Sequence, residues 1–183
     1  LAADAEVESV EEDRLAKPDL ATSVPLVNAP SAWSQGFTGS GVAVAVLDTG
    51  VDRSHPFFGN RVVHEACFSS TYAEQDAVSL CPNGASSQTG TGAAAACSVS
   101  GCFHGTHVAG IAAGHQSASF AGVARDAQII AIQVFTRFNN AALCGGASSC
   151  VMSYTSDQIR ALDYVLQLRA SYTIASVNMS FGG

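Results

Sequence analysis

Three features of the sequence predict an α/β fold with a doubly wound, mostly parallel sheet and helices on both faces. A continuous apolar run at 42–47, bounded by Gly41 and by residues 48–50, is typical of a strand buried on both faces, and further strands are predicted at 128–135 and 174–181. Helical patterns at 104–114 and from Ser156 onward alternate with these runs. The order strand, helix, strand, helix, strand favours parallel strands joined by right-handed crossovers.

The elements before the first strand are short. Residues 1–22 form an acidic lead, in which apolar and acidic residues alternate at residues 5–13 as in an exposed strand. We expect a short helix capped by Asn28, with Pro30 in its first turn and Gly36 ending it. Residues 23–183 are long enough to bury one sizeable core, so we treat them as a single domain.

The remaining elements follow in the order that the sheet requires. Small residues in the 104–114 helix let it lie close against a neighbour, although Gly110 lowers its helix propensity. Residues 67–102 are the least regular part of the chain, and 136–153 are expected to be a long loop. The last helix, capped by Ser156, has apolar residues at one-sided spacing, namely Ile159, Leu162, Val165 and Leu166.

Composition excludes several classes of function. Of the 183 residues, 48% are apolar and 13% are charged, which argues against disorder. Eight basic and fifteen acidic residues give a net charge of −7, so neither nucleic acid nor an anionic membrane is expected as a partner. No apolar run approaches the roughly 18 residues that a membrane span needs. The chain begins with Leu1 and not Met, so we expect a processed or truncated product.

The six cysteines indicate an oxidising compartment and hence a secreted protein. All lie in segments rich in small residues, where disulfides are the simplest account. Close spacing favours Cys97–Cys102 and Cys144–Cys150, which leaves Cys67–Cys81, although cysteine spacing alone does not fix the pairing. The alternative is a zinc site, because Cys97 and Cys102 are close in sequence to His104 and His107.

Candidate site residues gather at one edge of the predicted sheet. Ligands of open parallel sheets bind beyond the carboxyl ends of the strands. Asp48 follows the first strand, Ser180–Gly183 end the third, and His104 begins the helix between them. We therefore expect these three separate segments to meet and form one site.

Three motifs in these segments carry a resemblance to a known family. Residues 44–52 (VAVLDTGVD), 103–110 (FHGTHVAG) and 178–183 (NMSFGG) are similar, in this order, to segments of the subtilisin-like serine proteases. They cover the chain from about Ala32 to its end. The resemblance implies a serine endopeptidase that works through an Asp-His-Ser acyl-enzyme mechanism.

The resemblance also assigns roles to individual residues. His104 is implied to be the general base, and Asp48 to orient and stabilise its imidazole. Residues 180–182 (Ser180, Phe181 and Gly182) are implied to bind the extended substrate as an added strand. No segment here resembles the family's nucleophile segment, so the serine is expected beyond Gly183 and this chain is expected to be inactive alone.

The family further suggests partners and cofactors. The expected partners are a peptide or protein substrate, the C-terminal remainder of the peptidase domain, and the protein's own propeptide, whose last strand residues 5–14 resemble. A disordered acidic lead is the alternative for those residues. No cofactor is required for the chemistry. Structural calcium is conceivable, but Phe57 stands where the family's strong calcium site has an Asp, so that site is expected to be absent.

Three other functions compete with this interpretation. Asp-Thr-Gly at 48–50 is also the signature of aspartic proteases, but those need an all-β chain with a second carboxylate loop. A pseudo-protease with the same fold but no serine is the second alternative. Nucleotide binding through Gly39-Ser40-Gly41 is disfavoured, because these glycines precede the strand and do not follow it.

Overall fold

The computed structural model describes residues 20–117 and 120–182. The alternation expected at residues 5–13 therefore lies outside the described residues. The elements in chain order are α1 (Leu20–Leu26), α2 (Ala29–Ser34), β1 (Ala43–Asp48), β2 (Val62–Phe68), η1 (Ala73–Gln75), β3 (Ala77–Ser79), β4 (Ser87–Thr89), α3 (His104–Ala113), β5 (His115–Ser117), β6 (Phe120–Ala121), β7 (Gln128–Gln133), β8 (Thr136–Phe138), β9 (Cys150–Met152), α4 (Thr155–Leu168) and β10 (Ile174–Asn178).

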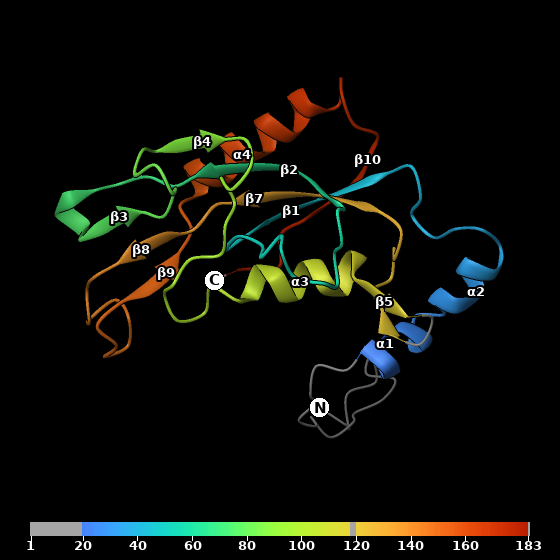
Figure 1. The fold of residues 1–183 in the computed structure, drawn as a ribbon. Coiled ribbons are helices and arrows are strands. Elements are labelled where there is room, and N and C mark those ends of the chain that lie inside the picture. The colour runs from blue at the N-terminus through green and yellow to red at the C-terminus, as the bar shows by residue number, and fades with distance from the viewer. Residues whose placement is uncertain (1–19, 118–119, 183) are drawn as a thin grey trace, which may run out of the picture.

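A five-stranded sheet forms the centre of the molecule, with strand order β10-β1-β7-β2-β4. The pairs β10–β1, β1–β7 and β7–β2 are parallel, and only β4 is antiparallel to its neighbour. This arrangement confirms the predicted α/β class and its mostly parallel sheet (Figure 1).

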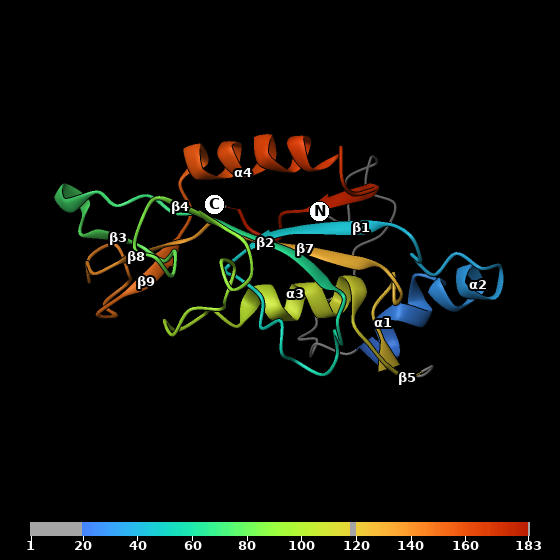
Figure 2. The same cartoon turned by 45° about the horizontal axis from the view of Figure 1, so that its top comes forward.

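The two long helices cover opposite faces of this sheet, as predicted. Figure 2 shows α4 on one side of the sheet and α3 on the other. The side chains of β1 alternate between these layers: Val44 and Val46 join the core cluster under α3, whereas Ala45 and Leu47 join the cluster under α4. Because every residue of β1 is buried, its run of small and branched apolar residues packs on both faces.

Helix α4 exposes most of its four regularly spaced apolar residues. Val165 is buried, while Ile159, Leu162 and Leu166 are 54%, 39% and 55% exposed. The buried face of the helix consists of Asp157, Ala161, Val165 and Leu168. This face was not predicted, because Asp157 is buried through its hydrogen bonds and the small Ala161 lets the helix approach the sheet.

Asp157 has enough partners to account for its burial. Its carboxylate accepts hydrogen bonds from the Ser70 amide and hydroxyl, each at 2.8 Å, and pairs with Arg160. A buried carboxylate with several donors is stable where an unpaired one would not be. Helix α4 begins at Thr155, after Tyr154, and not after a Ser156 cap.

Several strands were not predicted. Strand β2 was missed because His64 and Glu65 interrupt its apolar run, although Glu65 is buried and accepts a bond from the Gly92 amide. Strands β8 and β9 lie inside the expected loop 136–153, and with β3 they form a second, antiparallel sheet. Strand β10 ends at Asn178, three residues earlier than predicted.

All six cysteines are paired as close spacing suggested. The structure joins Cys67–Cys81, Cys97–Cys102 and Cys144–Cys150, with Cα–Cα distances of 5.5, 5.3 and 5.4 Å. These separations lie within the normal range for disulfides.

Helix α2 is held to the body of the domain by its tryptophan. The Trp33 indole donates a 2.8 Å hydrogen bond to the Val123 carbonyl, and the Arg125 guanidinium lies 4.5 Å from the ring centroid. The helix ends before Gly36, as predicted. Asn28 precedes it in a left-handed conformation (φ 59°) without a side-chain capping bond, so the expected Asn cap was wrong.

Candidate active site

Asp48 and His104 meet at the carboxyl edge of the sheet. Asp48 is the last residue of β1 and is completely buried, whereas His104 is the first residue of α3, with a side chain that is 46% exposed. The His104 Nδ1 lies 2.8 Å from Asp48 Oδ1 and 3.0 Å from Oδ2. Two residues separated by 56 positions thus form one carboxylate–imidazole pair.

The hydrogen bonds of this pair fix the position of the imidazole proton. An ionised carboxylate can only accept, so His104 must carry its hydrogen on Nδ1. Nε2 of the neutral ring then keeps a free lone pair, and no residue within 20–117 or 120–182 hydrogen-bonds to it. The pair therefore presents a base to the solvent, on the side of the ring away from Asp48.

Thr49 connects the two segments that carry the pair. Its amide donates a 2.7 Å hydrogen bond to Asp48 Oδ1. Its buried hydroxyl accepts from the Gly105 amide and donates to the Cys102 carbonyl, both at 3.0 Å. The sequence analysis did not single out Thr49; the only signal was its place between Asp48 and Gly50 in the motif.

Two glycines allow α3 to approach the end of β1 closely. A Cβ on Gly105 would overlap the Gly50 carbonyl oxygen and would lie 3.0 Å from Asp48 Cβ. A Cβ on Gly50, whose φ is 95°, would lie 2.7 Å from the carbonyl oxygens of Ala94 and Ala95. The Gly residues beside Asp48 and His104 are therefore required by space and, at Gly50, by backbone conformation.

Residues 180–182 leave the sheet at the same edge, and among the described residues no hydrogen bond joins them to the pair. Strand β10 runs parallel to β1, and Asn178 is aligned with Val46. The Ser180 hydroxyl donates to the Asn178 side chain at 2.9 Å, and the Phe181 ring packs on Phe135 with a centroid distance of 5.2 Å. Ser180 and Gly182 are exposed, so their backbone is accessible.

Comparison of the sequence with known proteins shows the family of this chain. The model of the subtilase family matches residues 39–182. The chain belongs to the subtilase family. It is 38% identical over 136 residues to subtilisin E of Bacillus subtilis (strain 168), and 39% identical over 120 residues to an alkaline protease of Shouchella clausii. These matches cover 72% and 63% of this chain, but only 29% and 25% of the relatives, so the chain spans less than a third of their length.

A solved structure supports the subtilisin-like fold. The CspB protease of Clostridium perfringens superimposes with a TM-score of 0.54 at 21% identity, over 83% of this chain and 31% of that chain. At this identity the likeness concerns the fold alone. The predicted family and fold class are thus both confirmed, whereas the catalytic roles of individual residues stay predictions.

The expected calcium ligand position is apolar. Phe57 is buried, and its ring packs against Phe120 at a centroid distance of 5.2 Å. A phenyl ring offers no oxygen to a hard cation, so Phe57 itself cannot be a calcium ligand, and the absence of the family's strong calcium site stays a prediction. Among the described residues, no group of three or more His, Cys, Asp or Glu side chains could hold a metal.

No described helix is both long and apolar enough to cross a bilayer.

Proposed function

We propose that this chain is the Asp- and His-bearing part of a serine endopeptidase. The observation that carries the proposal is the hydrogen bond between buried Asp48 and half-exposed His104, which leaves Nε2 free to accept a proton. A serine hydroxyl is a weak nucleophile at neutral pH and needs such a base beside it. Membership of the subtilase family supports the same chemistry.

In the proposed mechanism, His104 Nε2 takes the proton of a serine hydroxyl supplied by the C-terminal remainder. The serine oxygen attacks the scissile carbonyl carbon, and His104 then gives the proton to the departing amine. A water molecule then attacks the acyl-enzyme carbonyl in the same way, and His104 again takes the proton and returns it, this time to the serine oxygen. Asp48 holds the imidazole in the Nδ1–H tautomer and stabilises the imidazolium that forms at each transfer.

The substrate is an extended peptide that pairs with residues 180–182. Their exposed backbone continues from the sheet edge at which Asp48 ends. Main-chain hydrogen bonds to an added strand give affinity without reading the peptide's sequence. Gly182 has open space where a Cβ would stand, so a peptide can approach the backbone closely there.

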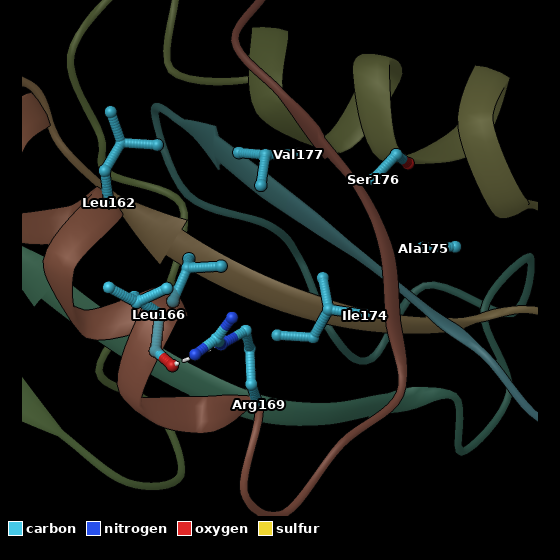
Figure 3. A pocket seen from close by; sticks show the side chains of 8 residues that line it. Leu162, Leu166, Arg169, Ile174, Ala175, Ser176 and Val177 are labelled. Atoms are coloured by element: carbon cyan, nitrogen blue, oxygen red, sulfur yellow. Dashed lines mark hydrogen bonds between the residues drawn. The ribbon is translucent and has the colours of Figure 1, made fainter.

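The C-terminal remainder of the peptidase domain is the partner that we propose for the bare edge of the sheet. Among the described residues, strand β10 is paired on one edge only, and its middle residues are exposed. An apolar groove of about 300 Å³ lies between β10 and α4, lined on the helix by Leu162 and Leu166 and on the strand by Ile174 and Val177 (Figure 3). A strand and an apolar layer added here would cover both surfaces.

The proposed compartment and accessory factors follow from the same features. Three disulfides fit secretion into an oxidising compartment. We propose that the chemistry needs no cofactor, since the pair itself supplies the base. The propeptide resemblance of residues 5–14 lies outside the described residues and stays a prediction.

The full-length protein, extended past Gly183, tests the proposal. We expect it to cleave casein and to be inactivated by a sulfonyl fluoride, with the sulfonyl group found by mass spectrometry on a serine after residue 183. Pepstatin should have no effect, which separates this function from aspartic proteolysis. A natural stop codon at the end of this sequence, or a protein that folds but neither cleaves nor reacts, would identify a pseudo-protease.

A further inference from the structure

The segment that precedes His104 is fastened to the catalytic pair at two points. The Cys102 carbonyl accepts the Thr49 hydroxyl, as described above, and the His104 amide donates a 3.0 Å hydrogen bond to the Gly101 carbonyl. Cys102 is 1% exposed and Thr49 is 2% exposed, so the bond between them does not compete with bulk water. The start of α3 therefore takes its position partly from Cys102.

A second anchor lies on the other side of the short loop. The Val51 amide donates a 2.8 Å hydrogen bond to the Ala94 carbonyl, and Ala94 is completely buried. Gly50 fits against the carbonyls of Ala94 and Ala95, where no Cβ could stand. Residues 93–95 are thus fixed to the chain that immediately follows Asp48.

The Cys97–Cys102 disulfide joins these two anchors. It links the segment fixed at Ala94 to the residue whose carbonyl holds Thr49, and so closes a ring that runs through Thr49, Gly50 and Val51. Asp48 and the start of α3 are both bonded to this ring at Thr49. The loop that it closes is partly exposed between the two cysteines. Without the covalent bond, the Cys102 carbonyl would depend on neighbouring backbone contacts alone.

We propose that the Cys97–Cys102 disulfide and the Thr49 hydroxyl act together as positioning elements for the Asp48–His104 pair. Cys102 presents its carbonyl to Thr49, Thr49 holds both the Asp48 carboxylate and the Gly105 amide, and the imidazole of His104 stays within hydrogen-bond distance of Asp48. This inference rests on the proposed function only for its effect on catalysis, because the Asp48–His104 contact exists independently of it. A displacement of about 1 Å in a catalytic group can cost on the order of 10²-fold in rate.

The test uses the full-length protein with both cysteines replaced, Cys97→Ala and Cys102→Ala together. We expect kcat to fall by about 10- to 100-fold with little change in KM, because the base moves while the substrate strand at residues 180–182 does not. The matched control is Cys144→Ala with Cys150→Ala, a disulfide of nearly equal sequence separation (6 against 5) that joins the β8–β9 loop. The control should keep kcat within about threefold.

Thr49 provides the second arm of the test. Thr49→Val removes the hydroxyl and should lower kcat to a similar extent, whereas Thr49→Ser keeps it and should restore most of the activity. Double-mutant analysis should show that the Thr49→Val and Cys97/Cys102 effects are less than additive, since both break one chain of contacts.

A readout that does not need proteolysis separates the two proposals. The Nδ1 proton of His104, held by Asp48, should give a low-field proton resonance in the full-length wild-type protein, and this resonance should be lost in His104→Gln. If the resonance is present and weakens in Thr49→Val and in the Cys97/Cys102 variant, the positioning inference stands even where peptidase activity is absent. If both variants lower only the melting temperature, and leave kcat and the resonance unchanged, the disulfide is a loop staple and the inference is overturned.

Discussion

Strands β1 and β10 are neighbours in one sheet, yet their environments differ sharply. Every residue of β1 is buried, whereas the middle of β10 is exposed and one edge is unpaired among the described residues. The acidic member of the candidate pair lies at the end of β1, and the base stands beside it on α3. Both members of the pair therefore belong to this chain, whereas the unpaired edge of β10 is open to a further strand.

The largest effect is expected where β1 meets α3. In the full-length protein, Asp48→Asn should lower kcat by about 10⁴-fold and His104→Ala by up to about 10⁶-fold, because in the proposed mechanism the first change disturbs the imidazole tautomer and the second removes the base. The measurement is steady-state peptide hydrolysis. His107→Gln, on the exposed face of the same helix, should change kcat by less than about threefold; equal losses in all three variants would contradict the assignment.

The close approach of α3 to β1 should make Gly105 intolerant of any side chain. Gly105→Ala would push against the Gly50 backbone, which cannot move aside as a side chain can, so we expect a loss of about 1–3 kcal/mol in the free energy of unfolding. Urea denaturation measures the loss. Gly110→Ala is the matched control on α3, because its Cβ would meet Phe57 at an ordinary 3.4 Å. The control should be neutral or slightly stabilising; if Gly105→Ala behaves like it, the packing described here is wrong.

The β10 side yields a smaller prediction that depends on the partner. Leu166 lines the groove beside β10, whereas Ile159 is equally exposed on α4 but lies outside the groove. In the full-length protein, Leu166→Gln should cost about 1–3 kcal/mol of stability because a covered side chain is lost. Ile159→Gln should stay within about 0.5 kcal/mol. Equal, negligible effects in chemical denaturation would mean that nothing covers this groove.

The smallest expected effect concerns acid stability near β2. Burial lowers the pKa of His64, ahead of the opposing influence of Glu65, and its Nε2 lies 2.8 Å from the Tyr164 hydroxyl. Below the ordinary His pKa of about 6.5, the unfolded chain therefore binds more protons than the folded one, and stability falls as the pH falls. The contribution is fully present above that pH. His64→Gln should flatten the slope of melting temperature between about pH 5 and 6.5; an unchanged slope would contradict this prediction.

The sequence predicted the site better than it predicted the surface of the fold. Apolar runs located β1 and β7, and the motifs placed Asp48 and His104 correctly at one edge. The buried face of α4 was not predicted, because side-chain hydropathy does not reveal that Asp157 has donors within reach, or that the small Ala161 is completely buried. Strand β2 was missed for the same reason, since its buried Glu65 depends on partners far along the chain.

The contacts that orient the pair could not be predicted at all. A threonine after an aspartate is compatible with many turns, and only the folded chain shows that one hydroxyl serves both Gly105 and Cys102. Tertiary hydrogen bonds of this kind depend on distances between segments that periodicity does not describe.

The docking of Trp33 gives the protein an intrinsic optical probe. This is the only tryptophan in the sequence, and its indole is bonded to the Val123 carbonyl beneath the Arg125 guanidinium. Its fluorescence maximum and its quenching by iodide will therefore report the release of α2 from the domain, without interference from any other indole. Unfolding that starts at this end of the molecule can thus be timed separately from the unfolding of the central sheet.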